Sequence, residues 1–87
     1  MKVALNLLLS TLKSVFKLAI GPQGSKLITL IIQWVKTIED KGMPGDEKRK
    51  EIQRQARAWL KERQLEVQDY LLNLAIEIIL AYVRKGK

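Results

Sequence analysis

"KGMPGDEKRKE", residues 41–51, separates two strongly apolar stretches and decides how the chain is divided. Gly42 can adopt the left-handed conformation that ends a helix, and Pro44 suits the first helical turn, where its missing N–H costs nothing. Asp46 and Glu47 favour the positive end of a new helix, because the helix dipole attracts negative charge there. The stretch therefore predicts a turn between two helices.

A phosphate-binding loop is the other interpretation of these glycines. Such a loop follows a strand and ends in a Lys-Ser or Lys-Thr pair, and neither feature is present in residues 41–51. We therefore treat residues 41–51 as a connection between helices.

"IGPQGS", residues 20–25, repeats this pattern closer to the N-terminus. Gly21 is placed to cap the C-terminus of one helix, with Pro22 just beyond it. Ser25 is placed to cap the N-terminus of the next helix through its hydroxyl. We therefore expect a second helix boundary here.

Between these boundaries the apolar residues recur with the period of an α-helix. β-branched residues are frequent, but the apolar segments are too long for strands. We predict a single all-α domain over residues 1–87, with four helices in antiparallel hairpins, at residues 2–20, 24–41, 45–63 and 67–84.

The third junction, "KERQLEVQDY" at residues 61–70, contains no glycine or proline. Either the third and fourth helices form one continuous helix, or they break within residues 64–67. A continuous helix would be about forty residues long, and typical globular helices are much shorter. We favour a short break.

The first, second and fourth helices have unusually narrow polar stripes; that of the first helix contains Lys2, Asn6, Ser10, Lys13 and Lys17. A helix that is apolar nearly all round is either central or buries a second face. One central helix is easy to accommodate in a small domain, whereas three are not. We therefore expect an apolar surface that another copy of the chain or lipid covers. The alternative is a compact monomer with a few exposed leucines.

The candidate assembly or membrane face lies on the first helix and comprises Leu8, Leu12, Val15, Phe16 and Ala19. At a membrane surface this apolar face would meet acyl chains while Lys13 and Lys17 meet headgroups.

The third helix carries the other candidate site, a row of cations at spacings of four, three and four: Lys50, Arg54, Arg57 and Lys61. Asp46 and Glu51 are spaced to pair with Lys50 and Arg54, whereas Arg57 and Lys61 have no acidic residue at such spacings. The row could follow nucleic-acid or lipid phosphates, or it could simply be a solvated face.

For the aromatic residues and for Glu77 we expect structural rather than functional roles. We expect all five aromatic residues to pack in the core: Phe16, Trp34, Trp59, Tyr70 and Tyr82. Glu77 either pairs with a lysine or ends the polar stripe of the fourth helix, and we favour the stripe. It has no partner carboxylate for acid–base catalysis.

Composition argues against an enzyme. The chain has no cysteine and no histidine, which removes thiolate and histidine metal sites and histidine base catalysis. We expect no cofactor, metal or small-molecule substrate. The net charge of +7 suits an anionic partner. No apolar run is long enough to cross a bilayer, and the N-terminus lacks a cleavage site, so we expect an intracellular protein.

Residues 34–83 resemble the soluble helical part of the LLH-type holins, small phage proteins also called holin superfamily six. The resemblance rests on Glu39 before the glycine-containing turn, a charged helix, a short "LEV" break and the apolar helix "LNLAIEIIL". It implies a phage or prophage origin and a part in host lysis. Members carry an N-terminal membrane-spanning helix, whereas residues 1–20 hold three lysines in an amphipathic pattern.

We therefore expect a non-enzymatic, holin-like protein that acts through self-assembly, at a membrane surface or as a virion component. It would lie in the host cytoplasm or virion, or at the periphery of the inner membrane. The alternative is a basic nucleic-acid-binding module that uses the third helix. Inhibition of a host protein would leave no mark in the sequence.

Overall fold

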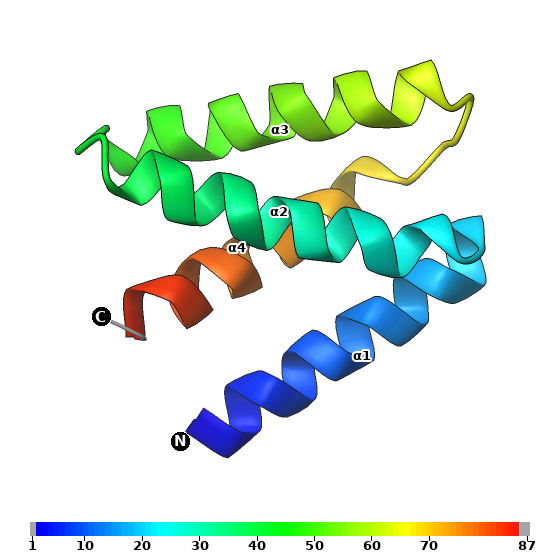
Figure 1. The fold of residues 1–87 in the computed structure, drawn as a ribbon, viewed down its shortest axis with the longest axis horizontal. Helices are drawn as coiled ribbons and strands as arrows, with labels where there is room; N and C mark the ends of the chain where they lie inside the picture. Colours follow the sequence, from blue (N-terminus) through cyan, green and yellow to red (C-terminus); the bar gives the residue numbers. More distant parts are fainter. Residues whose placement is uncertain (1, 86–87) are drawn as a thin grey trace.

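The computed structural model describes the backbone of residues 2–85 and the side chains of residues 7–84. It contains four helices: α1 (Lys2–Ile20), α2 (Gln23–Glu39), α3 (Gly45–Glu62) and α4 (Asp69–Lys85). Successive helices run in roughly opposite directions (Figure 1). The all-α, four-helix prediction is confirmed, and every helix end lies within two residues of its expected position. The side chains of Lys2 and Asn6, from the expected polar stripe, lie outside the described residues.

The helices α2 and α4 form the centre of the domain. Each contacts the other three helices, whereas α1 and α3 make no contact with each other within the described chain. Figure 1 shows α1 and α3 on opposite sides of this central pair. All four helices contribute fully buried side chains to one core, the largest being Phe16, Leu27, Ile28, Ile31, Val35, Ile52, Leu72, Ile76 and Ile79.

This arrangement explains two of the three narrow polar stripes. The domain accommodates two central helices, so most of the apolar circumference of α2 and α4 is covered from within. The peripheral helix α1 touches only α2 and α4. Packing within the domain therefore does not explain the apolar residues of α1 that face away from α2 and α4.

The α1–α2 connection turns at Gly21, which has a φ of +81°. The Gly21 N–H donates to the Lys17 carbonyl at 2.8 Å, which ends α1 as expected. Pro22 already has helical angles, φ −56° and ψ −26°, so α2 begins at once. The expectation for Ser25 is wrong: it lies inside the first turn of α2, and its hydroxyl lies 3.5 Å from the Pro22 carbonyl oxygen. A helix that starts directly after Gly21 leaves no extended residue at position 25.

Gly24 holds the start of α2 against the backbone of α1. A Cβ atom added to Gly24 would lie 2.2 Å from the carbonyl oxygen of Phe16 and 2.6 Å from the amide nitrogen of Lys17. Two helices can approach this closely only where one of them has no side chain.

The α2–α3 connection follows the sequence prediction with one difference. Gly42 has a φ of +69°, the left-handed conformation expected of it. Pro44 precedes α3 with extended angles, φ −58° and ψ 151°, so it lies one position before the first helical residue. Its carbonyl accepts the Lys48 N–H at 3.0 Å, which starts the hydrogen-bond pattern of the helix. Asp46 and Glu47 occupy the first turn, as expected.

The α3–α4 junction is a break, as favoured from the sequence. Gln64 takes the left-handed role that glycine has at the other two turns, with a φ of +57°. The Gln64 N–H donates to the Lys61 carbonyl at 3.1 Å, and the Leu65 N–H donates to the Leu60 carbonyl at 2.9 Å. This pair of hydrogen bonds is a Schellman motif, which terminates a helix.

Candidate functional site

The candidate face on α1 is only partly exposed. Leu12 and Phe16 are buried in the core, at 4% and 0% exposure, so their assignment to an outer face is wrong. Leu8 is 43% exposed, Ala19 is exposed and Val15 is half-buried. The reason is geometric: in a helix that is apolar nearly all round, residue type does not tell which apolar side faces the core.

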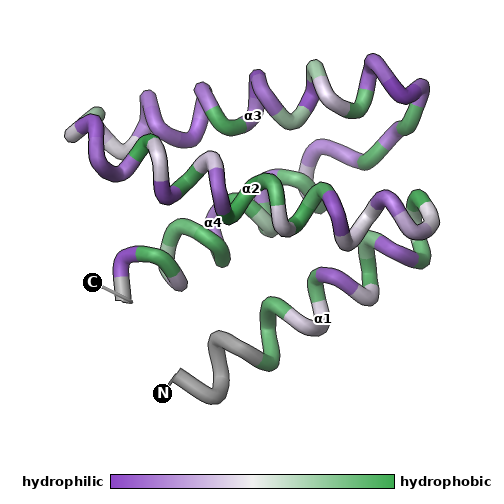
Figure 2. The backbone as a smooth tube through the Cα atoms, viewed as in Figure 1, coloured by the Kyte–Doolittle hydropathy of each residue, from purple (hydrophilic) through white to green (hydrophobic). Residues whose placement is uncertain are grey.

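The most exposed apolar residues of α1 are two that the sequence analysis did not select. Leu7 is 63% exposed and Leu18 is 88% exposed. They are eleven residues apart, about three helical turns, and therefore lie on one side of the helix. Together with the three outward residues of the expected face they make up the α1 row: Leu7, Leu8, Val15, Leu18 and Ala19. Figure 2 shows how much of α1 is hydrophobic, in contrast to α3.

A second exposed apolar group lies on α4. Tyr70 is 70% exposed and Leu74 is 51% exposed, while Ile78 is half-buried and Ala81 is exposed. Their spacings of four, four and three place them on one side of the helix, and we call them the α4 row. The expectation that Tyr70 packs in the core is wrong, because the core side of α4 is filled by residues such as Leu72 and Ile79. The other four aromatic residues are buried or half-buried.

The basic row of α3 faces away from the core, but half of its charge is paired. The Nε of Arg54 donates to Glu51 at 3.1 Å, and Arg57 forms an ion pair with Asp69 of α4. The spacing rule found no acidic partner for Arg57, because this partner lies on another helix. Lys50 and Lys61 are exposed and have no ion pair in the described part of the chain.

The electrostatics of Glu51 follow from its contact with Arg54. The hydrogen bond from Arg54 lowers the pKa of Glu51 from its ordinary 4.5 to about 2, with a second contribution from the side chain of Gln55. The same hydrogen bond raises the pKa of Arg54. Beside this pair, a hollow of about 530 Å³ lies between α3 and α4, lined by Lys50, Gln53, Arg54, Arg57, Asp69 and Asn73.

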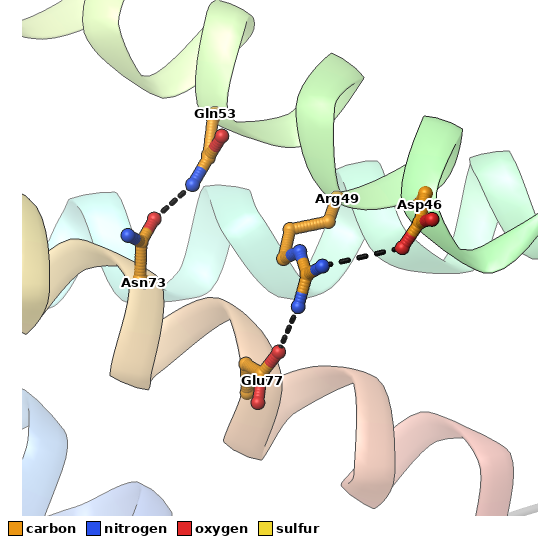
Figure 3. A network of polar contacts seen from close by, with 5 residues as sticks. All are labelled: Asp46, Arg49, Gln53, Asn73 and Glu77. Atoms are coloured by element: carbon orange, nitrogen blue, oxygen red, sulfur yellow. Dashed lines mark hydrogen bonds and ion pairs between the residues drawn. The ribbon is translucent and has the colours of Figure 1, made fainter.

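A line of polar contacts joins α3 to α4 (Figure 3). Arg49 forms an ion pair with Glu77 and a second one with Asp46 at 3.3 Å. Gln53 donates a hydrogen bond to Asn73, which lies one turn before Glu77 on α4. The Glu77 side chain is 55% exposed, which agrees with its place at the edge of the polar stripe, although its partner is an arginine from α3.

Among the ion pairs of the described residues, the most buried one joins the end of α2 to the start of α3. The Nζ of Lys48 lies 2.8 Å from Oε1 of Glu39, and only 12% and 8% of these two side chains are exposed. The Nε of Arg84 approaches the same oxygen at 3.7 Å. Glu39 therefore connects α2 to the start of α3 and to the end of α4. Sequence spacing did not reveal this pair, because its members are nine residues apart across a turn.

No helix within the described residues is long and apolar enough to cross a membrane. The same part of the chain contains no cluster of three or more acidic side chains that could hold a metal ion. Comparison with protein-family models, with curated proteins and with solved structures finds no match to this chain. Among the described residues, the candidate sites are the two apolar rows and the basic row of α3.

Proposed function

We propose that this protein is a non-enzymatic helical protein that acts by assembling with further copies of itself. The observation that supports this proposal is the pair of exposed apolar rows on α1 and α4. When a partner removes large apolar side chains such as Leu18, at 88% exposure, from water, the free energy of the system falls, which favours assembly. Contiguous exposed apolar groups are typical of interaction surfaces.

The resemblance of residues 34–83 to the LLH-type holins supports a phage or prophage setting for this assembly. In that setting the protein would act in the host cytoplasm, at the inner surface of the membrane, or as a component of the virion. The amphipathic character of α1 supports a peripheral rather than a membrane-spanning role, with Lys13 and Lys17 available to lipid headgroups.

The test is size-exclusion chromatography with multi-angle light scattering, without detergent and at low and high salt. A discrete oligomer that persists at high salt is expected, because apolar contacts are not screened by ions. A monomer of 10.0 kDa across the concentration range would overturn the proposal. Leu18→Glu should weaken the oligomer, whereas Gln33→Glu adds the same charge to an exposed site of α2 outside both rows and should not.

Membrane-surface action is tested separately by sedimentation with vesicles. Binding to vesicles that contain anionic lipid should fall in Leu18→Glu and persist in Gln33→Glu. A wild-type protein that assembles but stays in the supernatant would restrict the proposal to assembly in solution or in the virion.

Nucleic-acid binding through α3 is the second candidate function. Lys50 and Lys61 favour it, since both are exposed cations without an ion pair among the described residues. Such binding should fall steeply with salt and disappear when Lys50, Arg54, Arg57 and Lys61 are all changed to alanine. The internal pairs of Arg54 and Arg57 weigh against it, because they leave fewer cations for phosphates. Binding that is insensitive to salt would contradict this candidate.

A further inference from the structure

We infer that the hollow between α3 and α4 binds a single phosphate group. Six side chains line this hollow of about 530 Å³: Lys50, Gln53, Arg54, Arg57, Asp69 and Asn73. The inference concerns binding without a reaction. It does not rest on the proposed self-assembly, because none of these side chains belongs to the α1 row or the α4 row.

The charge around the hollow is positive. Lys50, Arg54 and Arg57 are exposed cations of α3, and Lys50 has no ion pair within the described part of the chain. Asp69 is the one carboxylate among the six lining residues, and Glu51 holds Arg54 without lining the hollow. Three cations against two carboxylates leave a surplus of positive charge, which favours an anion.

The two arginines keep N–H donors although both form ion pairs. A guanidinium group carries five N–H donors. Arg54 uses its Nε and Nη2 atoms for Glu51, and Arg57 uses its Nη2 atom for Asp69. The Nη1 atom of each arginine is left for a further oxygen atom. The two carboxylates also restrict the arginine side chains, so a ligand has less ordering to impose.

Asn73 provides a neutral donor from the opposite wall of the hollow. Its Oδ1 atom accepts the hydrogen bond from Gln53, which bridges α3 and α4. Figure 3 shows the nitrogen of Asn73 pointing away from both Gln53 and Glu77. Gln53 and Asn73 are half-buried, and their contact fixes the direction of the Asn73 amide. Both N–H groups of Asn73 Nδ2 therefore remain for a ligand.

Donors on two walls suit a tetrahedral anion. Arginine binds carboxylates and phosphates well, but a carboxylate presents two oxygen atoms in one plane, whereas phosphate presents oxygen atoms in several directions. The volume lies within the range of about 300 to 1,000 Å³ that is usual for ligand pockets, so it also admits the rest of a phosphate ester. None of the six lining residues is aromatic, so the hollow offers no surface for stacking a base.

The test compares two lysines of the same row. Lys50 lines the hollow, whereas Lys61 lies eleven residues later, about 16 Å along α3, and lines a different one. Both are exposed, and neither has an ion pair among the described residues. Lys50→Gln and Lys61→Gln therefore remove the same charge from the same helix. Circular dichroism should show native helix content and melting in both variants.

Inorganic phosphate is the first probe, added in place of chloride at constant ionic strength and followed by NMR chemical shifts. Saturable shifts that include the Asn73 side-chain amide are expected. Lys50→Gln should weaken binding about tenfold, because it removes one charge-assisted hydrogen bond. Lys61→Gln should weaken it less than about twofold, since salt screens a charge at this distance. Equal effects of the two variants, or no saturable shift in the wild type, would overturn the inference.

Asn73→Asp tests the opposite wall. It replaces both N–H donors by a carboxylate, and Gln53 can still donate to the new side chain. Phosphate binding should disappear while the melting temperature stays close to that of the wild type. Acetate at the same ionic strength should bind at least about tenfold more weakly than phosphate, because it cannot reach both walls. Unchanged phosphate binding by Asn73→Asp, or equal binding of acetate, would contradict a phosphate site.

Two further probes identify the source of the phosphate group: single-stranded oligothymidylate, and vesicles of phosphatidylcholine with phosphatidic acid. A probe that uses the hollow should be displaced by inorganic phosphate and weakened more by Lys50→Gln than by Lys61→Gln. If the oligonucleotide binds and both variants weaken it equally, the whole row binds it, and the second candidate function stands without the hollow. If inorganic phosphate binds and the oligonucleotide does not, the inference stands and the second candidate function fails.

Discussion

Gly24 lies so close to the backbone of Phe16 that no side chain fits between them. The nearest atom to an added Cβ is the Phe16 carbonyl oxygen at 2.2 Å, with the Phe16 carbonyl carbon at 2.3 Å. Because both belong to the backbone of α1, they cannot move aside as the end of a side chain could. The same residue, Phe16, is fully buried in the core. This contact fixes how closely the peripheral helix α1 packs on α2.

Gly24→Ala should therefore destabilise the protein by about 3 kcal/mol, the upper end of the usual cost of overpacking. The clash outweighs the gain of up to about 1 kcal/mol that alanine has over glycine within a helix. Urea unfolding followed by circular dichroism measures this loss. Gly45→Ala is the matched control, since a Cβ there meets only a side-chain atom of Arg84 at 3.8 Å. A Gly24→Ala protein as stable as the control would contradict the close packing.

Gln64→Gly should stabilise the protein. Gln64 has a φ of +57°, and left-handed angles cost a non-glycine residue about 1 kcal/mol. Glycine removes this cost, although the added freedom of the unfolded chain offsets part of the gain. We expect a net increase of about 0.5 kcal/mol in the free energy of unfolding. Gly42→Ala, the opposite exchange at a φ of +69°, should lower it. A lower stability of Gln64→Gly would show that its side chain has a favourable role.

Lys48→Met should destabilise the protein by about 2 kcal/mol, because it leaves the buried carboxylate of Glu39 without its closest cation. Arg84→Met should cost less than about 1 kcal/mol, since Arg84 is 52% exposed and 3.7 Å away. Replacing both partners, as Glu39→Leu with Lys48→Met, should recover most of the loss, because no buried charge remains. A double variant less stable than Lys48→Met alone would contradict this account.

Acid should break the Glu51–Arg54 contact only at low pH. The pKa of Glu51 is lowered from 4.5 to about 2 by the Arg54 hydrogen bond, so the folded state favours the charged carboxylate. The stability from this contact is fully present above pH 4.5 and is lost as the pH falls towards 2. An NMR titration of the Glu51 carboxyl measures the midpoint. Arg54→Gln should raise this midpoint towards 4.5, whereas Arg57→Gln should leave it unchanged.

Most helix boundaries could be predicted from sequence patterns. Gly21 and Gly42 end their helices as expected, because the left-handed conformation is a property of the residue and its neighbours. A break within residues 64–67 was predicted from helix length, and it lies at residues 63–68, although Gln64 gave no local signal for it. Ser25 failed as a cap because Pro22 was already helical, which residue type alone did not reveal.

The candidate sites could be predicted from the sequence only in part. The row of cations on α3 followed from spacing within one helix, and so did the Glu51–Arg54 pair. The Arg57–Asp69 pair did not, since it joins α3 to the start of α4. The exposed side of α1 was assigned to Leu12 and Phe16, which the structure buries, while Leu18 was overlooked.

The physical reason is the range of the interactions involved. Helix period, glycine turns and pairs three or four residues apart depend on neighbours along the chain. The sequence alone therefore predicted the four helices and the basic row of α3. The close contact of Gly24 with Phe16, the buried Glu39–Lys48 pair and the outward direction of Leu18 depend on how the helices pack. Packing determines which side of the nearly all-apolar α1 meets the core. It leaves the α1 row and the α4 row exposed.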